Sequence, residues 1–181
     1  TLTAHGDTTF AARASGAGTT LIGAYQGIET RSALQFSGFT TLATTVTIDS
    51  AVLSLAVNYR FKEASGTLAV SVHEILTTWS QDSLAWANTL DPAFAAPGAA
   101  YRFLMNISAT DTFVTVHVDS LVRKWVAAGT NAPNGLLLLP ELISSNIIAG
   151  SEPRAPLETR PAIKIYYRTT PADTQQQALT L

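Results

Sequence analysis

Cysteine is absent from this sequence, and charged residues are scarce. Without cysteine, neither a disulfide framework nor a thiolate-bound metal site can form, so the hydrophobic core alone must hold the fold. Charged residues account for 13% of the 181 residues, about half of the ~25% that is usual in soluble domains. With a formal net charge of -2, the chain lacks the basic surface typical of nucleic-acid-binding proteins, and we expect no nucleic-acid partner.

Long apolar runs and known catalytic motifs are also missing. No stretch reaches the ~18 apolar residues of a transmembrane helix, so we expect no membrane span. The sequence contains no Gly-x-Ser-x-Gly, His-Glu-x-x-His or Walker pattern. Its 13 acidic residues are scattered, and no spacing singles out a glycosidase pair. We therefore expect a protein that is not an enzyme and that needs no metal or cofactor.

What the sequence does contain is a series of short apolar runs separated by Gly, Pro, Asn and Asp. The run from Val52 to Tyr59 is the clearest, because Leu53, Leu55 and Val57 recur with the period of two that is typical of a half-buried strand. Many short strands without helices between them predict an all-β fold, an antiparallel, jelly-roll-like β-sandwich. The predicted strands are Thr8–Ala12, Ser32–Phe36, Ala51–Arg60, Thr67–Ile75, Tyr101–Ile107, Phe113–His117, Gly135–Leu139 and Ile163–Arg168.

One short helix interrupts this pattern. Asp119 or Ser120 can cap it, and Gly129 is a natural end. The apolar residues between them share one helical face; they are Leu121, Val122, Trp125 and Val126. The sequence therefore predicts an all-β sandwich with a single helix of two or three turns.

Histidine and tryptophan are the side chains to weigh for binding chemistry. His73 and His117 fall on the polar sides of predicted strands, where they are either solvated or, if those strands are neighbours, able to share a metal. Trp79, Trp86 and Trp125 either close the ends of the sandwich or offer flat rings to sugars, and the structural role is favoured. Asn106 begins the only glycosylation sequon, a pattern of low specificity.

The two ends of the chain differ from its middle. Residues 1–6 form an extended N-terminal segment and residues 169–181 an extended C-terminal tail, on either side of one domain over residues 7–168. Both ends alternate apolar and hydroxyl residues, as in Thr1–Ala4 and Ala178–Leu181. Each end is therefore interpreted either as a flexible tail or as an edge strand that pairs with something. Because the chain starts at Thr1, we expect a processed product or an excised domain.

Several landmarks in this order are similar to a known family. They are Asp7–Phe10, Arg31–Phe36, Ser50–Leu55, Trp79 with Trp86, Asp119–Val122 with Trp125, Asn134–Leu138, Ser151–Glu152 and Arg160–Tyr167. Together, over about residues 7–168, the chain resembles the DNRLRE domain, also called the family-96 carbohydrate-binding-module type. The resemblance implies an extracellular, non-catalytic β-sandwich of prokaryotic type. Some such domains bind acidic polysaccharides such as alginate, but the matching positions are fold markers and imply no ligand residues.

Two functions follow from these observations. The first is a structural protein, extracellular or on the cell surface, that assembles into a fibre or surface layer when a terminal strand of one copy adds to the sheet of the next. The side chains expected to sit in grooves of the next subunit are Leu2 and Ala4, or Leu179 and Leu181; the alternative is that these tips fold back on their own domain. Sparse charge favours this function because it lowers repulsion between copies. The alternative is a carbohydrate-binding module that recognises an extracellular polysaccharide, which can be an acidic one.

Overall fold

The fold is described from a computed structural model. It describes residues 20–36, 42–80, 82–110, 112–129, 134–141, 147–151, 161–170 and 175–180. Within these ranges, antiparallel strands form three four-stranded sheets. The all-β fold with one α-helix agrees with the sequence-based prediction. The predicted strand Thr8–Ala12 lies outside the described residues.

Sheet A has the strand order β2-β1-β10-β5, sheet B the order β3-β9-β6-β7, and sheet C the order β12-β11-β4-β8. In sheet A, the bounds are β1 Thr20–Tyr25, β2 Ile28–Thr30, β5 Tyr59–Lys62 and β10 Ile147–Ser151. In sheet B, they are β3 Ser32–Leu34, β6 Gly66–Glu74, β7 Tyr101–Ile107 and β9 Leu136–Pro140. In sheet C, they are β4 Thr47–Val57, β8 Thr112–His117, β11 Ala162–Arg168 and β12 Gln175–Thr180.

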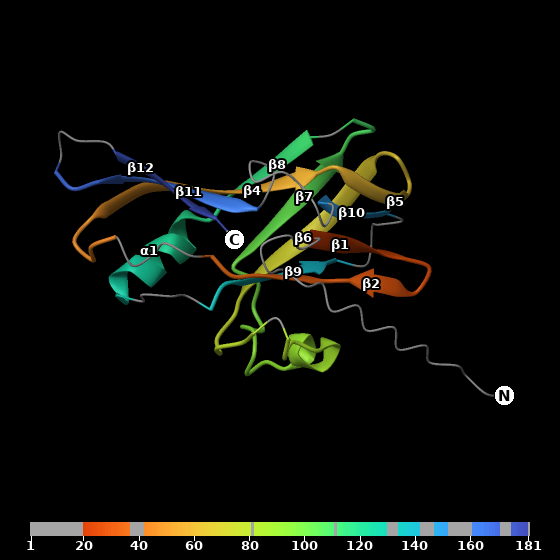
Figure 1. Cartoon of the computed structure of the whole chain (residues 1–181), viewed down its shortest axis with the longest axis horizontal. Coiled ribbons are helices and arrows are strands. Elements are labelled where there is room, and N and C mark those ends of the chain that lie inside the picture. Colours follow the sequence, from red (N-terminus) through yellow and green to blue (C-terminus); the bar gives the residue numbers. More distant parts are fainter. Residues whose placement is uncertain are drawn as a thin grey trace.

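Figure 1 shows the layers: the strands of sheet C lie on one side, β9, β1 and β2 lie on the other, and helix α1 (Asp119–Ala127) lies at one end. Bent strands join the sheets. Only Asn58 separates β4 from β5, and only Arg31 separates β2 from β3. The single strand predicted over Ala51–Arg60 is therefore wrong, because the chain passes there from sheet C to sheet A and the backbone N–H of Asn58 donates to Gly150 O at 3.0 Å.

The core lies between the sheets and under α1. Ile22, Leu53, Val70 and Leu138 bring all three sheets into one cluster of buried side chains. The predicted helical face is confirmed, since Leu121, Val122, Trp125 and Val126 are all buried. The predicted cap is wrong, because no side chain caps α1. The carboxylate of Asp119 instead accepts the backbone N–H of Ala51 on β4. Gly129, with φ +63°, follows the helix as predicted.

Most predicted strands agree with the observed ones to within one or two residues, and Tyr101–Ile107 agrees at both ends. Strands β1 and β10 were not predicted, because each contains a glycine. Gly23 has φ +146°, and a Cβ at Gly150 would lie 1.6 Å from the backbone oxygen of Thr20. These glycines therefore permit the close approach of β1 and β10 and do not interrupt the strands.

Candidate functional site

The two strand histidines do not form a shared site. His73 is on β6 in sheet B and His117 is on β8 in sheet C. The expectation of a solvated histidine is wrong for His73, which is 8% exposed; its Nδ1 donates to Ala96 O at 2.7 Å and its Nε2 lies 3.0 Å from Ser71 Oγ. His117 is exposed, with Nδ1 3.6 Å from the Asp119 carboxylate. Among the described residues, no three His, Cys, Asp or Glu side chains cluster as metal ligands would.

The Ser71–His73 pair has no arrangement for catalysis. A nucleophilic serine needs a base oriented by a third group and must reach its substrate. Here a backbone carbonyl holds the second imidazole nitrogen, and Ser71 is only 5% exposed. The hollow beside His73 has a volume of about 130 Å³, well below the ~300 Å³ at which ligand pockets begin. This pair satisfies its own buried polar atoms between sheet B and the segment that covers it.

All three tryptophans make contacts within the protein, but the burial favoured from the sequence is observed for Trp125, whereas Trp79 and Trp86 are half-buried. Trp79 Nε1 donates to Asn134 O at 2.7 Å, and Trp125, 4% exposed, donates through Nε1 to Glu74 Oε1 at 2.8 Å. Trp86 lies under the guanidinium of Arg31, whose Cζ is 4.1 Å from the ring centroid. Each ring therefore has a face or its N–H engaged within the protein.

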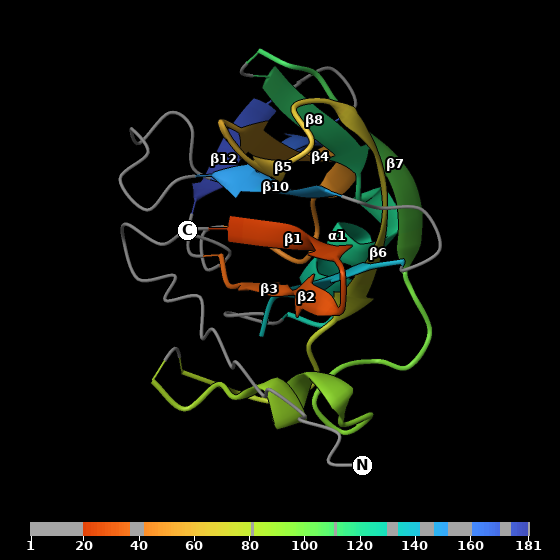
Figure 2. The ribbon, with the colours of Figure 1, turned by 90° about the vertical axis from the view of Figure 1, so that its right-hand side faces the viewer.

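Arg31 connects the excursion between β6 and β7, which is the segment of residues 75–100, to the sheets. Its Nε pairs with Glu29 Oε1 at 2.6 Å, and its Nη1 donates to the backbone and side-chain oxygens of Thr89 at 3.2 and 2.9 Å. Thr89 belongs to the short 3-10 helix η2 (Trp86–Leu90) of this excursion. Beneath it, the side chains of Ala33, Ile75, Phe94, Ala95 and Leu137 form a second buried cluster. Figure 2 shows the excursion at the far end of the molecule from sheet C.

The C-terminal segment contains an edge strand. β12 pairs antiparallel with β11 over six positions, from Ala162 opposite Thr180 to Tyr167 opposite Gln175. The backbone of Leu179 is opposite Ile163, so in this structure it pairs within its own chain. The other three predicted contact residues, Leu2, Ala4 and Leu181, lie outside the described residues. Gln175–Thr180 therefore forms an edge strand that folds back on its own domain.

The edge strands of the three sheets differ in the residues that protect them from pairing with another chain. Proteins commonly block exposed edges with charged residues, proline or bulges. Such charges are present in β2 (Glu29), β5 (Arg60 and Lys62) and β7 (Arg102), whereas β3 is buried along its whole length. Strands β12 and β8, which are the two edges of sheet C among the described residues, contain no Asp, Glu, Lys, Arg or Pro. Sheet C is therefore the sheet whose two edges lack these protecting residues.

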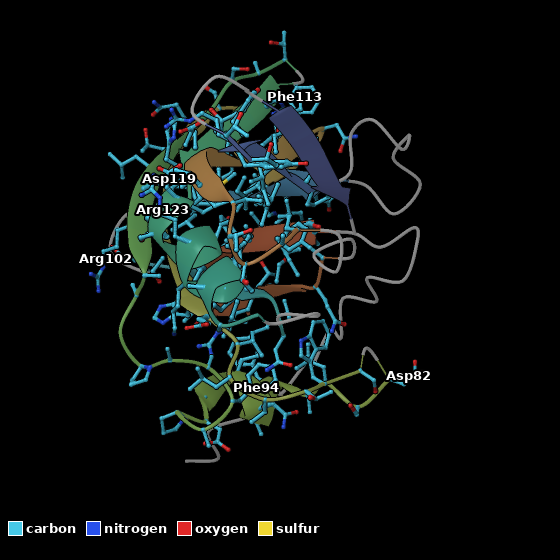
Figure 3. All side chains as sticks on the ribbon, turned by 90° about the vertical axis from the view of Figure 1, so that its left-hand side faces the viewer. Asp82, Phe94, Arg102, Phe113, Asp119 and Arg123 are labelled. Atoms are coloured by element: carbon cyan, nitrogen blue, oxygen red, sulfur yellow. The ribbon has the colours of Figure 1, made fainter. Side chains whose placement is uncertain are left out.

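The outer face of β8 is exposed, while its inner face is fixed in the core. Phe113 is 55% exposed, and the His117 side chain 74%. Facing inward, Val116 is buried and pairs with Leu53, in a β4–β8 register that runs without a shift. Figure 3 shows Phe113 on β8 at one end of the molecule, whereas Arg102 projects sideways from β7. β8 thus combines a buried inner face with an exposed aromatic side chain on its outer face.

Comparison with family models, with curated proteins and with solved structures finds no match for this chain. In the described part of the chain, no helix is both long enough and apolar enough to cross a membrane. The edges of sheet C are therefore the candidate functional site on physical grounds alone.

Proposed function

We propose that this protein is a non-catalytic structural protein, extracellular or on the cell surface, whose copies self-assemble into a fibre or layer through the C-terminal edge strand β12. The observation that carries the proposal is the sequence Gln-Gln-Gln-Ala-Leu-Thr of β12 at the edge of sheet C, without charge or proline. An unprotected edge has a row of backbone groups that can pair with another strand. The sparse charge of the whole chain supports the same proposal, because copies repel each other weakly.

Assembly of the purified full-length chain tests this function. Negative-stain microscopy and light scattering should find long, uniform polymers, and a chain ending at Arg168 should stay monomeric because β12 is missing. Circular dichroism and thermal unfolding of the shortened chain must first establish that it folds. A well-folded full-length chain that stays a 19.2 kDa monomer across the accessible concentration range contradicts the proposal. Immunogold labelling of intact producing cells tests the proposed location.

Binding of an acidic polysaccharide is a second candidate, favoured by one cluster on sheet A. The rings of Tyr25 and Phe61 meet edge to face at 5.9 Å, and Lys62 Nζ lies 5.2 Å from both ring centroids. An aromatic ring beside a cation is a suitable contact for a sugar that carries a carboxylate. Affinity electrophoresis in alginate should then show retardation that Lys62→Gln weakens, with Lys164→Gln on sheet C as the matched control. Equal mobility of all three chains, with and without alginate, contradicts this candidate.

A further inference from the structure

The two edges of sheet C run in opposite directions. Each neighbouring pair in the order β12-β11-β4-β8 is antiparallel. With four alternating strands, the first and the last are antiparallel to each other. If a second copy lies beside the first in the same orientation, β12 of one copy therefore meets β8 of the next as an antiparallel pair. Such a head-to-tail contact joins two different surfaces, so it can repeat without closing.

The other edges offer a poorer acceptor. β5 carries Arg60 and Lys62, and the backbone of Lys62 has φ +76°, which departs from the extended conformation of a strand. β7 carries Arg102, paired with Glu141 at 2.6 Å on the outer face of sheet B. A strand added at either edge would bring an uncharged segment against fixed charges. Strand β8 contains no Asp, Glu, Lys or Arg and no residue with a positive φ.

The β8 edge is also ordered in advance. At its start, Arg60 Nε donates to Ser108 O at 2.7 Å and the same guanidinium donates to Thr110 O, which holds the turn between β7 and β8. At its end, Asp119 accepts the backbone N–H of Ala51 on β4. A strand fixed at both ends loses little conformational entropy when a partner pairs with it. Among the described residues, β4 is the one strand that forms a ladder with β8.

We propose that the acceptor for β12 is the β8 edge of the next copy, so that sheet C continues through successive subunits. This inference rests on the proposed self-assembly and specifies its partner site. Strands in a sheet are about 4.8 Å apart, so the four strands of sheet C advance each subunit by about 19 Å. With a twist of about 20–25° per strand, successive subunits rotate by about 80–100°. The assembly is therefore a helical filament.

A matched pair of charge substitutions tests the acceptor. Phe113 on β8 and Leu104 on β7 are 55% and 64% exposed, so lysine at either position leaves the core unchanged. Phe113→Lys should raise the critical concentration for assembly at least tenfold, while Leu104→Lys should change it less than twofold, both measured by sedimentation. Circular dichroism confirms that each variant is folded. Equal effects of the two substitutions, or none from Phe113→Lys, overturn the proposal.

The absence of cysteine allows a direct test by cross-linking. Two strands separate β12 from β8 within one chain, a distance of about 14 Å that no disulfide spans. The strand registers place Thr115 and Thr180 in one row across sheet C, and His117 and Ala178 in another, so a neighbouring copy in the same orientation brings the two members of each pair together. A chain carrying Thr115→Cys with Thr180→Cys, or His117→Cys with Ala178→Cys, should therefore form only intermolecular disulfides. Oxidation should give a ladder of covalent multimers on a non-reducing gel. Leu104→Cys, combined with the same β12 substitutions, is the control and should give none.

The two experiments separate this inference from the function on which it rests. Wild-type filaments, together with no β8–β12 ladder and full assembly of Phe113→Lys, overturn the acceptor and leave self-assembly standing. A wild-type chain that never polymerises overturns both. Helical reconstruction of wild-type filaments gives a third result: an axial advance far from about 19 Å per subunit contradicts a continuous sheet C.

Discussion

At the scale of single residues, the glycines of sheet A are fixed by contact with backbone. Gly150 on β10 lies so close to β1 that a Cβ there would be 1.6 Å from Thr20 O. Since a backbone oxygen cannot rotate away as a side chain does, any larger residue must separate two paired strands. The same close approach exists at Gly23, whose Cβ would lie 2.1 Å from Ile147 O.

Gly150→Ala should therefore destabilise the protein strongly. We expect a loss of about 2–3 kcal/mol in the free energy of unfolding, at the upper part of the range for overpacked interiors. Urea unfolding followed by tryptophan fluorescence measures it. Gly66→Ala is the control, because no atom lies within 4 Å of a Cβ at that position and the expected change is within about 1 kcal/mol. If both variants unfold at the wild-type urea concentration, β1 and β10 are not packed as described.

At the scale of elements, Arg31 connects the η2 part of the excursion between β6 and β7 to the sheets. Arg31 contacts Glu29, Thr89 and the ring of Trp86, and its side chain is only 13% exposed. Arg31→Ala removes the link between η2 and the sheets and leaves the Glu29 carboxylate without this partner. Amide exchange in residues 86–90 should then accelerate by at least tenfold, as measured by hydrogen-exchange mass spectrometry.

Arg102→Ala provides the control for this prediction. Arg102 forms an ion pair with Glu141 at the same distance of 2.6 Å, but its side chain is 67% exposed. Exposed ion pairs contribute roughly 0–1 kcal/mol, so exchange in residues 86–90 should stay at the wild-type rate. Equal acceleration in both variants would show that the excursion responds to general destabilisation and not to the loss of Arg31.

Local pattern and long-range pairing explain which elements the sequence predicted. Strand β7 and the buried face of α1 were predicted because their apolar residues recur with the period of the element that they form. β1 and β10 were not, since their glycines look like breaks until the partner strand is known. The burial of His73 depends on Ala96, 23 residues further along the chain, a contact that no local pattern predicts. An edge strand was one of the alternatives that the alternation at the C-terminus left open, whereas the role proposed for β8 requires the strand order.

At the scale of the whole molecule, the distribution of charge decides how assembly responds to salt. The proposed contact joins β12 to β8, two strands without Asp, Glu, Lys or Arg, and a net charge of -2 leaves little repulsion to screen. The critical concentration for assembly should therefore change less than about threefold between 50 and 500 mM NaCl, where the Debye length falls from about 14 to about 4 Å. Pelleting across this salt series measures it. A contact in which Arg102, Arg60 or Lys62 pairs with an acidic group of the next copy would instead weaken by tenfold or more, as would binding of an acidic polysaccharide near Lys62. Salt-insensitive assembly, combined with salt-sensitive retardation in alginate, would assign the two activities to different sheets.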